Sequence, residues 1–189
     1  VPYLKNFSEQ YPRIRLNLHQ VERFPDFSDE TLDVMIGLSE HFATPENYVR
    51  KKLGQTRYVL CASQNYLSKH QPIKTIRDLI GHDFIGHSQR PQPDLISFKA
   101  EQTISIKPKF LMNDSQEMVK TALADLGVIF VHDYRVNHLL EEGRLLEILP
   151  KQASERVNRY VVYDYQKYLK PIIRVFVDFL QTVDEFKIV

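Results

Sequence analysis

Several apolar runs of the sequence end at residues, most of them polar, that could bind a small molecule. In open α/β sheets, ligands gather at the carboxyl ends of strands and at helix amino ends, where unpaired N–H groups and the helix dipole favour anions. These positions therefore predict a site for a small, anionic ligand. The candidate contacts are Gly37, Leu38, Ser63, His87, Ser88, Asn113, Asp114, Ser115 and His132.

The run Asn113-Asp114-Ser115 is the best of these candidates. It directly precedes an apolar stripe at helical spacing, and Asp114 stands three residues before Glu117, as in a capping box. A helix cap alone explains these residues equally well. If an anion binds, the negative charge of Asp114 opposes it, and Asn113 and Ser115 are the expected direct contacts.

Cofactor and metal chemistry find no support in the sequence. Its six glycines form no phosphate-binding loop and no dinucleotide fingerprint. His82 and His87 are separated by four residues, but no further ligands follow at metal-binding spacing. We therefore expect no cofactor and no metal.

Nucleophilic catalysis is equally unsupported. Cys61 lies inside an apolar run and is most simply a small core residue. Asp133 beside His132, with Ser63 or Ser88 elsewhere, would supply the residue types of a triad, but nothing in their spacing requires one. We expect a protein without catalytic activity.

Strands and helices alternate along the chain. Residues 58–62 form a continuous apolar run that predicts a strand covered on both faces, followed by a polar elbow over 63–72. Loops are expected over 24–31, 39–47 and 88–94. Further strands are expected at 14–18, 32–38, 83–86, 96–98, 103–112, 128–131 and 158–163, and helices at 1–10, 76–80, 115–126, 134–142 and from Pro171 onward. Residues 145–149 form a further apolar segment. The buried face of the last helix should carry Ile172, Val175, Phe176, Phe179 and Val183.

This pattern predicts an α/β protein in two lobes of mixed, mostly parallel sheet flanked by helices. The first lobe should be discontinuous, comprising residues 1–62 and 163–189, and the second should span residues 63–162. Two connecting segments make a hinge, so the cleft between the lobes is the expected ligand site.

Composition narrows the possible partners. The chain has 25 Lys plus Arg against 24 Asp plus Glu and a net charge of +1, which argues against this piece gripping a phosphate backbone by itself. No run reaches the length of a membrane span. One cysteine cannot form an internal disulfide, which is compatible with a reduced, cytoplasmic setting.

Short segments carry a family resemblance through their order and spacing across nearly all 189 residues. They are Phe7-x-x-x-Tyr11-Pro12-x-Ile14-x-Leu16, Leu32-Asp33-Val34-x-Ile36, Ala62-Ser63-x-x-Tyr66-Leu67, Thr75-x-x-Asp78-Leu79-x-x-His82, Asn113-Asp114, Ala122-Leu123-Ala124-x-Leu126-Gly127-Val128, Gly143-Arg144-Leu145-Leu146-x-x-Leu149-Pro150 and Pro171-x-x-x-x-Phe176-x-x-Phe179-Leu180. Together they resemble the effector-binding domain of LysR-type transcriptional regulators. The chain departs from the family where it has Gln64 and His132 in place of Pro, and Gly37-Leu38 where Arg is frequent.

The resemblance implies a fold like that of type 2 periplasmic binding proteins and a cytoplasmic transcription factor that binds a small-molecule effector between its lobes. It also implies DNA binding through a winged helix-turn-helix preceding Val1, and a homodimer or tetramer without membrane contact. Head-to-tail pairing would place residues 1–10 and 14–18 of one subunit beside 134–142 of another. An alternative is an extracytoplasmic solute-binding protein of a transporter. A further alternative is a transferase or dehydratase on a related fold. The residues before Val1 would distinguish a regulator from a solute-binding protein.

Overall fold

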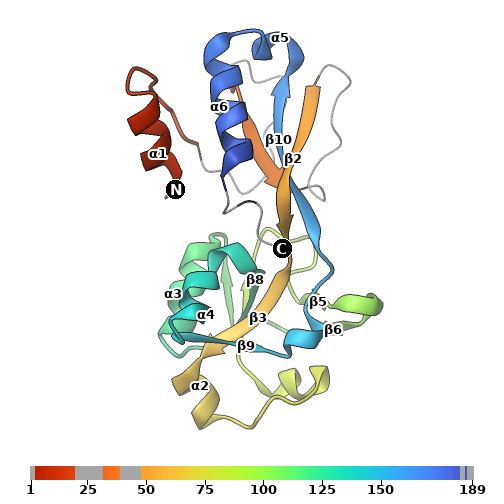
Figure 1. Cartoon of the computed structure of the whole chain (residues 1–189). Helices are drawn as coiled ribbons and strands as arrows, with labels where there is room; N and C mark the ends of the chain where they lie inside the picture. Colours follow the sequence, from red (N-terminus) through yellow and green to blue (C-terminus); the bar gives the residue numbers. More distant parts are fainter. Residues whose placement is uncertain (1–2, 20–31, 39–47, 184–185, 187–189) are drawn as a thin grey trace. The chain divides into compact units, whose positions relative to one another are not determined.

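The computed structural model describes residues 3–19, 32–38, 48–183 and 186, and divides into two compact units (Figure 1). The first unit comprises Val1–Gln55 and Val157–Val189, and the second comprises Thr56–Arg156. The chain thus passes between units at 55–56 and 156–157, several residues earlier on each pass than the lobe limits predicted from sequence. The loops expected at 24–31 and 39–47 lie outside the described residues.

The second unit is built on a five-stranded sheet with the order β7-β4-β8-β3-β9. The strands are β3 (Tyr58–Ser63), β4 (Phe84–His87), β7 (Phe110–Met112), β8 (Val128–His132) and β9 (Leu145–Ile148). β4 runs parallel to β7 and β8, whereas β3 runs antiparallel to β8 and β9. The mixed sheet was predicted correctly, but its antiparallel share was underestimated.

β3 is covered on both faces, as its apolar run predicts. Val59 and Cys61 belong to one buried cluster, and Leu60 and Ala62 belong to another. Successive side chains of a strand point to opposite faces, so this alternation places a core on each side of the sheet.

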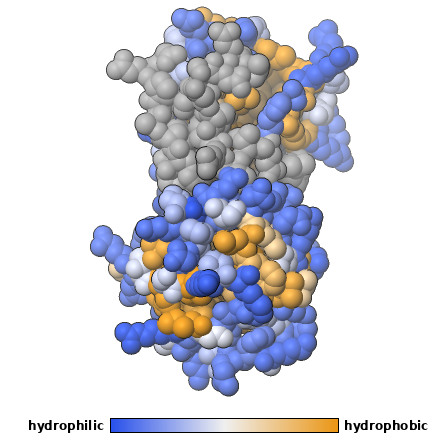
Figure 2. Space-filling model, turned by 180° about the vertical axis from the view of Figure 1, so that it is seen from behind, coloured by the Kyte–Doolittle hydropathy of each residue, from blue (hydrophilic) through white to orange (hydrophobic). Residues whose placement is uncertain are grey.

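Helices and short turns surround this sheet. The helix α3 (Ser115–Leu123) packs against β3, β4 and β8 through Met118, Val119 and Ala122. The remaining elements are α2 (Gln64–Lys69), α4 (Asn137–Glu141), the 3₁₀ turns η2 (Ile76–Gly81), η3 (Lys99–Glu101), η4 (Asp133–Arg135) and η5 (Pro150–Gln152), and the hairpin of β5 (Leu95–Ser97) and β6 (Thr103–Ser105). Figure 2 shows hydrophobic residues exposed among hydrophilic ones on the surface of this unit.

The first unit carries a three-stranded sheet with the order β1-β10-β2. Its strands are β1 (Met35–Leu38), β2 (Tyr48–Thr56) and β10 (Val157–Asp164), and its helices are α1 (Tyr3–Gln10), α5 (Tyr165–Tyr168) and α6 (Pro171–Thr182). Phe7 of α1 is fully buried and lies 5.0 Å from the rings of Phe176 and Phe179 on α6. This aromatic contact joins the first and last helices.

Several predicted elements differ from the structure. Residues 14–18 are not assigned as a strand, although Ile14 and Leu16 are half-buried between exposed neighbours. β1 pairs antiparallel with β10 and not parallel, and the predicted strand 103–112 separates into β6 and β7. The helix predicted at 134–142 becomes η4 followed by α4. The polar elbow contains α2, whose start is capped by the Ser63 hydroxyl.

The predicted buried face of α6 was displaced by about one residue. Its most buried side chains are Ile173, Val177 and Leu180, whereas Ile172 is 49% exposed. The polar residues Arg174, Asp178 and Gln181 recur at i, i+4 and i+7 and form one narrow stripe. Apolar residues therefore occupy most of the rest of the helix surface, and spacing alone does not select which of them are the most buried. No helix in the described part of the chain combines the length and apolarity of a membrane span.

Candidate ligand-binding site

One edge of the five-stranded sheet collects most of the predicted contacts. β4, β7 and β8 run parallel, so their carboxyl ends meet at this edge, where His87 pairs with Met112 and the Ser88 N–H bonds to the Met112 carbonyl at 2.8 Å. His132 ends β8 beside Tyr58, the first residue of β3. The edge therefore brings together His87, Ser88, Asn113, Asp114, Ser115 and His132.

Ser63 does not belong to this group. β3 is antiparallel to β8, so Ser63 pairs with Leu145 and ends β3 at the opposite edge of the sheet. There the Ser63 hydroxyl accepts a bond from the Tyr66 N–H and donates one to Asp125, which also accepts from Asn65. These bonds lower the pKa of the Asp125 carboxyl. The expectation that Ser63 converges with the other strand ends was wrong, since its strand direction is reversed.

Gly37 and Leu38 lie in the first unit, at the end of β1. Gly37 pairs with Tyr160 of β10 and Leu38 with Arg159, and the Leu38 side chain is buried. Leu38 is thus part of a packed strand. A role for either residue in ligand binding stays a prediction.

Asp114 occupies the amino end of α3. Its Oδ1 accepts hydrogen bonds from the N–H groups of Gln116 at 2.6 Å and Glu117 at 3.3 Å. This confirms the predicted cap. Because the chain's own carboxylate already satisfies these donors, the helix end is a poor cradle for a phosphate, and exposed Asn113 and half-buried Ser115 stand beside it.

His132 is only 8% exposed and forms part of an aromatic stack. Its ring centroid lies 3.8 Å from that of Tyr58 and 5.7 Å from that of Tyr134. Its Nδ1 lies 3.4 Å from the hydroxyl of the buried Thr56, and that hydroxyl also lies 2.5 Å from Asp133 Oδ1, to which it donates. These contacts therefore fix the His132 ring at the carboxyl end of β8.

Arg90 supplies positive charge near this stack and was missed by sequence analysis. Its Nη2 donates to the Phe130 carbonyl at 2.9 Å, and its guanidinium lies 4.6 Å from the ring centroid of Tyr58 and 5.5 Å from that of Phe130. No carboxylate in the described ranges pairs with it. Arg57, by contrast, is neutralised by a bidentate pair with Glu147 at 2.8 and 3.1 Å.

The missed residues carried little sequence signal. Arg90 falls in a turn segment without periodicity. Thr56 ends β2 and Tyr58 begins β3, and the apolar run predicted only that a strand begins there. The antiparallel pairing of β3 with β8 brings Tyr58 opposite His132. An apolar run alone does not reveal the direction of a strand, so the sequence did not predict this contact.

Neither Thr56 nor Cys61 is arranged as an activated nucleophile. The Thr56 hydroxyl donates to Asp133, so it is not activated by the histidine as a triad nucleophile would be. Burial raises the pKa of the Cys61 thiol to about 12, which keeps it protonated. Within the part of the chain that the structure describes, no cluster of three or more His, Cys, Asp or Glu could hold a metal ion.

Known proteins resemble the chain over nearly its whole length. Residues 1–185 match the model of the LysR substrate binding domain. The transcriptional regulator CrgA of Neisseria meningitidis serogroup B is 26% identical over 182 residues, covering 95% of this chain and 60% of that protein. The transcriptional activator TtdR of Escherichia coli K12 is 23% identical over 183 residues, covering 95% and 58%. The chain thus spans about three fifths of the length of these relatives.

Solved structures show the same fold. The regulatory domain of CrgA from Neisseria meningitidis superposes with a TM-score of 0.86 at 24% identity, covering 95% of this chain and 89% of that one. The regulatory domain of AphB from Vibrio vulnificus gives a TM-score of 0.80 at 22% identity, covering 96% and 91%. The described helices and mixed sheets therefore have the type 2 periplasmic-binding-like fold, and the chain belongs to the LysR substrate-binding domain family.

Proposed function

We propose that this chain is the ligand-sensing part of a LysR-type DNA-binding transcriptional regulator. The observation that carries the proposal is the family match over residues 1–185, supported by relatives that are themselves transcriptional regulators. The remainder of such a protein would bind DNA through a winged helix-turn-helix. It would act as a cytoplasmic homodimer or tetramer and perform no catalysis.

The ligand binds at the carboxyl edge of the second unit's sheet. Arg90 is the group best suited to hold its negative charge, because no described carboxylate competes for it. Exposed Asn113 and Ser88 add hydrogen-bonding groups, and Tyr58 holds the Arg90 guanidinium against its ring. Since Asp114 fills the end of α3, a carboxylate fits this edge better than a phosphate.

Ligand binding regulates by shifting a population of lobe arrangements. A ligand that binds one arrangement more tightly favours it by the difference in binding free energy, and thereby changes the spacing of paired DNA-binding parts. The relatives reported above give no support to the transporter alternative, because they are regulators.

A thermal-shift screen tests the proposal. The domain is heated with organic acids, amino acids, aromatic carboxylates and inorganic phosphate, each in excess. At a hundredfold excess over its dissociation constant, a ligand adds about 2.7 kcal/mol and raises the midpoint by several degrees. We expect a selective carboxylate that no longer stabilises Arg90→Gln but still stabilises the exposed control Arg156→Gln. A ligand that stabilises all three proteins equally would place the site elsewhere.

A further inference from the structure

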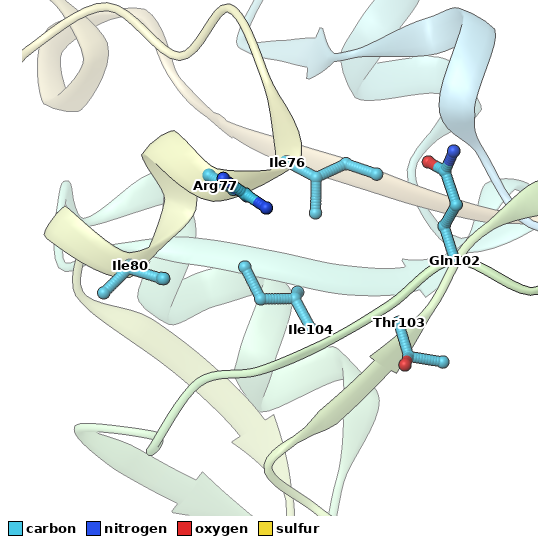
Figure 3. A pocket seen from close by; sticks show the side chains of 6 residues that line it. All are labelled: Ile76, Arg77, Ile80, Gln102, Thr103 and Ile104. Atoms are coloured by element: carbon cyan, nitrogen blue, oxygen red, sulfur yellow. The ribbon is translucent and has the colours of Figure 1, made fainter.

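The second unit carries a pocket outside the edge described above. It has a volume of about 510 Å³, and its lining residues are Ile76, Arg77, Ile80, Gln102, Thr103 and Ile104. Figure 3 shows residues of η2 on one side and residues at and just before β6 on the other. Pockets of roughly 300–1,000 Å³ are typical of small-molecule sites.

Topology separates this pocket from the carboxyl edge. η2 ends at Gly81, and the chain then enters β4 at Phe84, so the helix precedes the amino end of that strand. His87, which lies at the proposed effector edge, ends the same strand. η2 therefore lies toward the amino end of β4, whereas the proposed effector site lies at the carboxyl end of this strand.

The floor of the pocket is apolar. Ile76 and Ile104 are half-buried and pack against the buried cluster on this face of the sheet. Ile80 is 67% exposed although it lies beside them in the same pocket. Three isoleucines around one hollow give a short aliphatic chain a continuous surface from which it displaces water.

The pocket also has one positively charged lining residue, Arg77. Arg77 is exposed, and no carboxylate in the described ranges forms an ion pair with it. The adjacent Asp78 is occupied elsewhere, since its Oδ2 accepts from the N–H groups of Lys74 at 2.9 Å and Thr75 at 2.7 Å. The guanidinium is thus available to a bound anion.

The opposite side of the pocket supplies neutral hydrogen-bonding groups. The side chains of Gln102 and Thr103 are exposed and make no hydrogen bond to the rest of the described chain. They stand at the end of the turn from Lys99 to Gln102, which is closed by the Gln102 N–H bonding to the Lys99 carbonyl at 3.3 Å. This turn of the β5–β6 hairpin fixes the backbone positions of Gln102 and Thr103.

From this arrangement we propose that the pocket binds a small organic acid with a short aliphatic chain. The carboxylate pairs with Arg77 and the aliphatic chain covers Ile76, Ile80 and Ile104, while Gln102 and Thr103 border the opposite side of the pocket. This second site goes beyond the proposed effector site and does not depend on it. The carboxyl terminus of a partner protein, or a second copy of this chain, would be a rival occupant.

The test uses the whole chain with ¹³C-labelled isoleucine δ1 methyl groups, observed by NMR. Hexanoate is the probe, hexanamide lacks its charge, and acetate lacks its apolar chain. We expect hexanoate to shift the methyl signals of the three pocket isoleucines saturably, in the millimolar range that so few atoms allow. The methyls of Ile129 and Ile173, buried in other clusters, serve as internal controls and should stay in place.

Variants separate the charge from the apolar contact. Arg77→Gln should weaken hexanoate binding by up to about fivefold. Arg156→Gln, which alters an exposed arginine of the same unit, should leave it unchanged. Hexanamide and acetate should each bind more weakly than hexanoate. Methyl spectra recorded in parallel show whether each variant is folded.

Three outcomes would overturn the proposal. Absence of any saturable shift up to tens of millimolar hexanoate would remove the site. Equal shifts in the Arg77→Gln variant would show an apolar surface without an anion site. Shifts of the same methyls on dilution without ligand would identify a contact between copies of this chain instead.

Discussion

The ring of His132 stacks on the ring of Tyr58 with their centroids 3.8 Å apart, across the paired strands β8 and β3. Tyr58 stands two residues after the start of the second unit at Thr56. The stack therefore ties the entry of the chain into this unit to the edge where its parallel strands end. A ligand bound at this edge would therefore lie near the ring pair of His132 and Tyr58.

Ser63→Ala should destabilise the protein by about 1–2 kcal/mol, because it removes the cap of α2 and the bond to Asp125. Urea unfolding measures this loss. Ser68→Ala, an exposed substitution within α2, is the matched control and should cost less. Ligand affinity should be unchanged by Ser63→Ala, since Ser63 lies at the opposite sheet edge; lost affinity would contradict that placement.

Ala100→Gly should stabilise the protein by about 0.5–1 kcal/mol. Ala100 and Glu101 have φ values of 54° and 57°, a conformation that costs a side-chain-bearing residue about 1–2 kcal/mol and glycine little. The greater freedom of glycine in the unfolded chain offsets part of this gain. Ala124→Gly, at a φ of −84°, is the control and should not stabilise. Equal midpoints for Ala100→Gly and the original protein would argue against this turn.

Stability should decline on mild acidification because of His82. Burial, and then the nearby His70, lower the pKa of His82 below the usual histidine value of about 6.5. The unfolded chain therefore takes up a proton at a higher pH than the folded one. The contribution of neutral His82 to the free energy of unfolding is fully present above about pH 6.5, and it is lost as the pH falls from there through the pKa of the folded state.

Melting curves between pH 7.5 and 5 measure this effect. His82→Gln should reduce the pH dependence of the midpoint, whereas the exposed control His138→Gln should leave it unchanged. An undiminished slope in His82→Gln would assign the dependence to other groups.

Cys61 should resist thiol reagents while the protein is folded. It is fully buried, so a reagent cannot reach it. Burial also raises its pKa to about 12, so the reactive thiolate does not form near neutral pH. Iodoacetamide at pH 8, followed by mass spectrometry, should modify the thiol only after denaturation. Rapid labelling of the native protein would show that β3 opens.

The sequence was informative where a local pattern determined the outcome. The apolar run of β3 predicted burial on both faces, and Asp114 with the stripe behind it predicted the start and core face of α3. Both signals arise from neighbouring residues. The short polar helix α2 was missed because only its cap, and no apolar periodicity, marks it.

Relations between distant segments were less predictable. Ser63 follows an apolar strand as His132 does, but strand direction depends on pairing, and the antiparallel setting of β3 separates them. Arg90 became a site residue only through its contacts with Tyr58 and Phe130. The sequence thus indicated which strand ends carry polar groups, while the register of the sheet decided which of them meet.

Calorimetric titration of the best stabilising carboxylate into the original protein, Arg90→Gln and Arg156→Gln tests the sensing role most directly. We expect one ligand per chain, affinity at least tenfold weaker for Arg90→Gln, as loss of a charged hydrogen bond of about 1.5 kcal/mol implies, and unchanged affinity for Arg156→Gln. Equal affinity for all three proteins would contradict a ligand site at the carboxyl edge of this sheet.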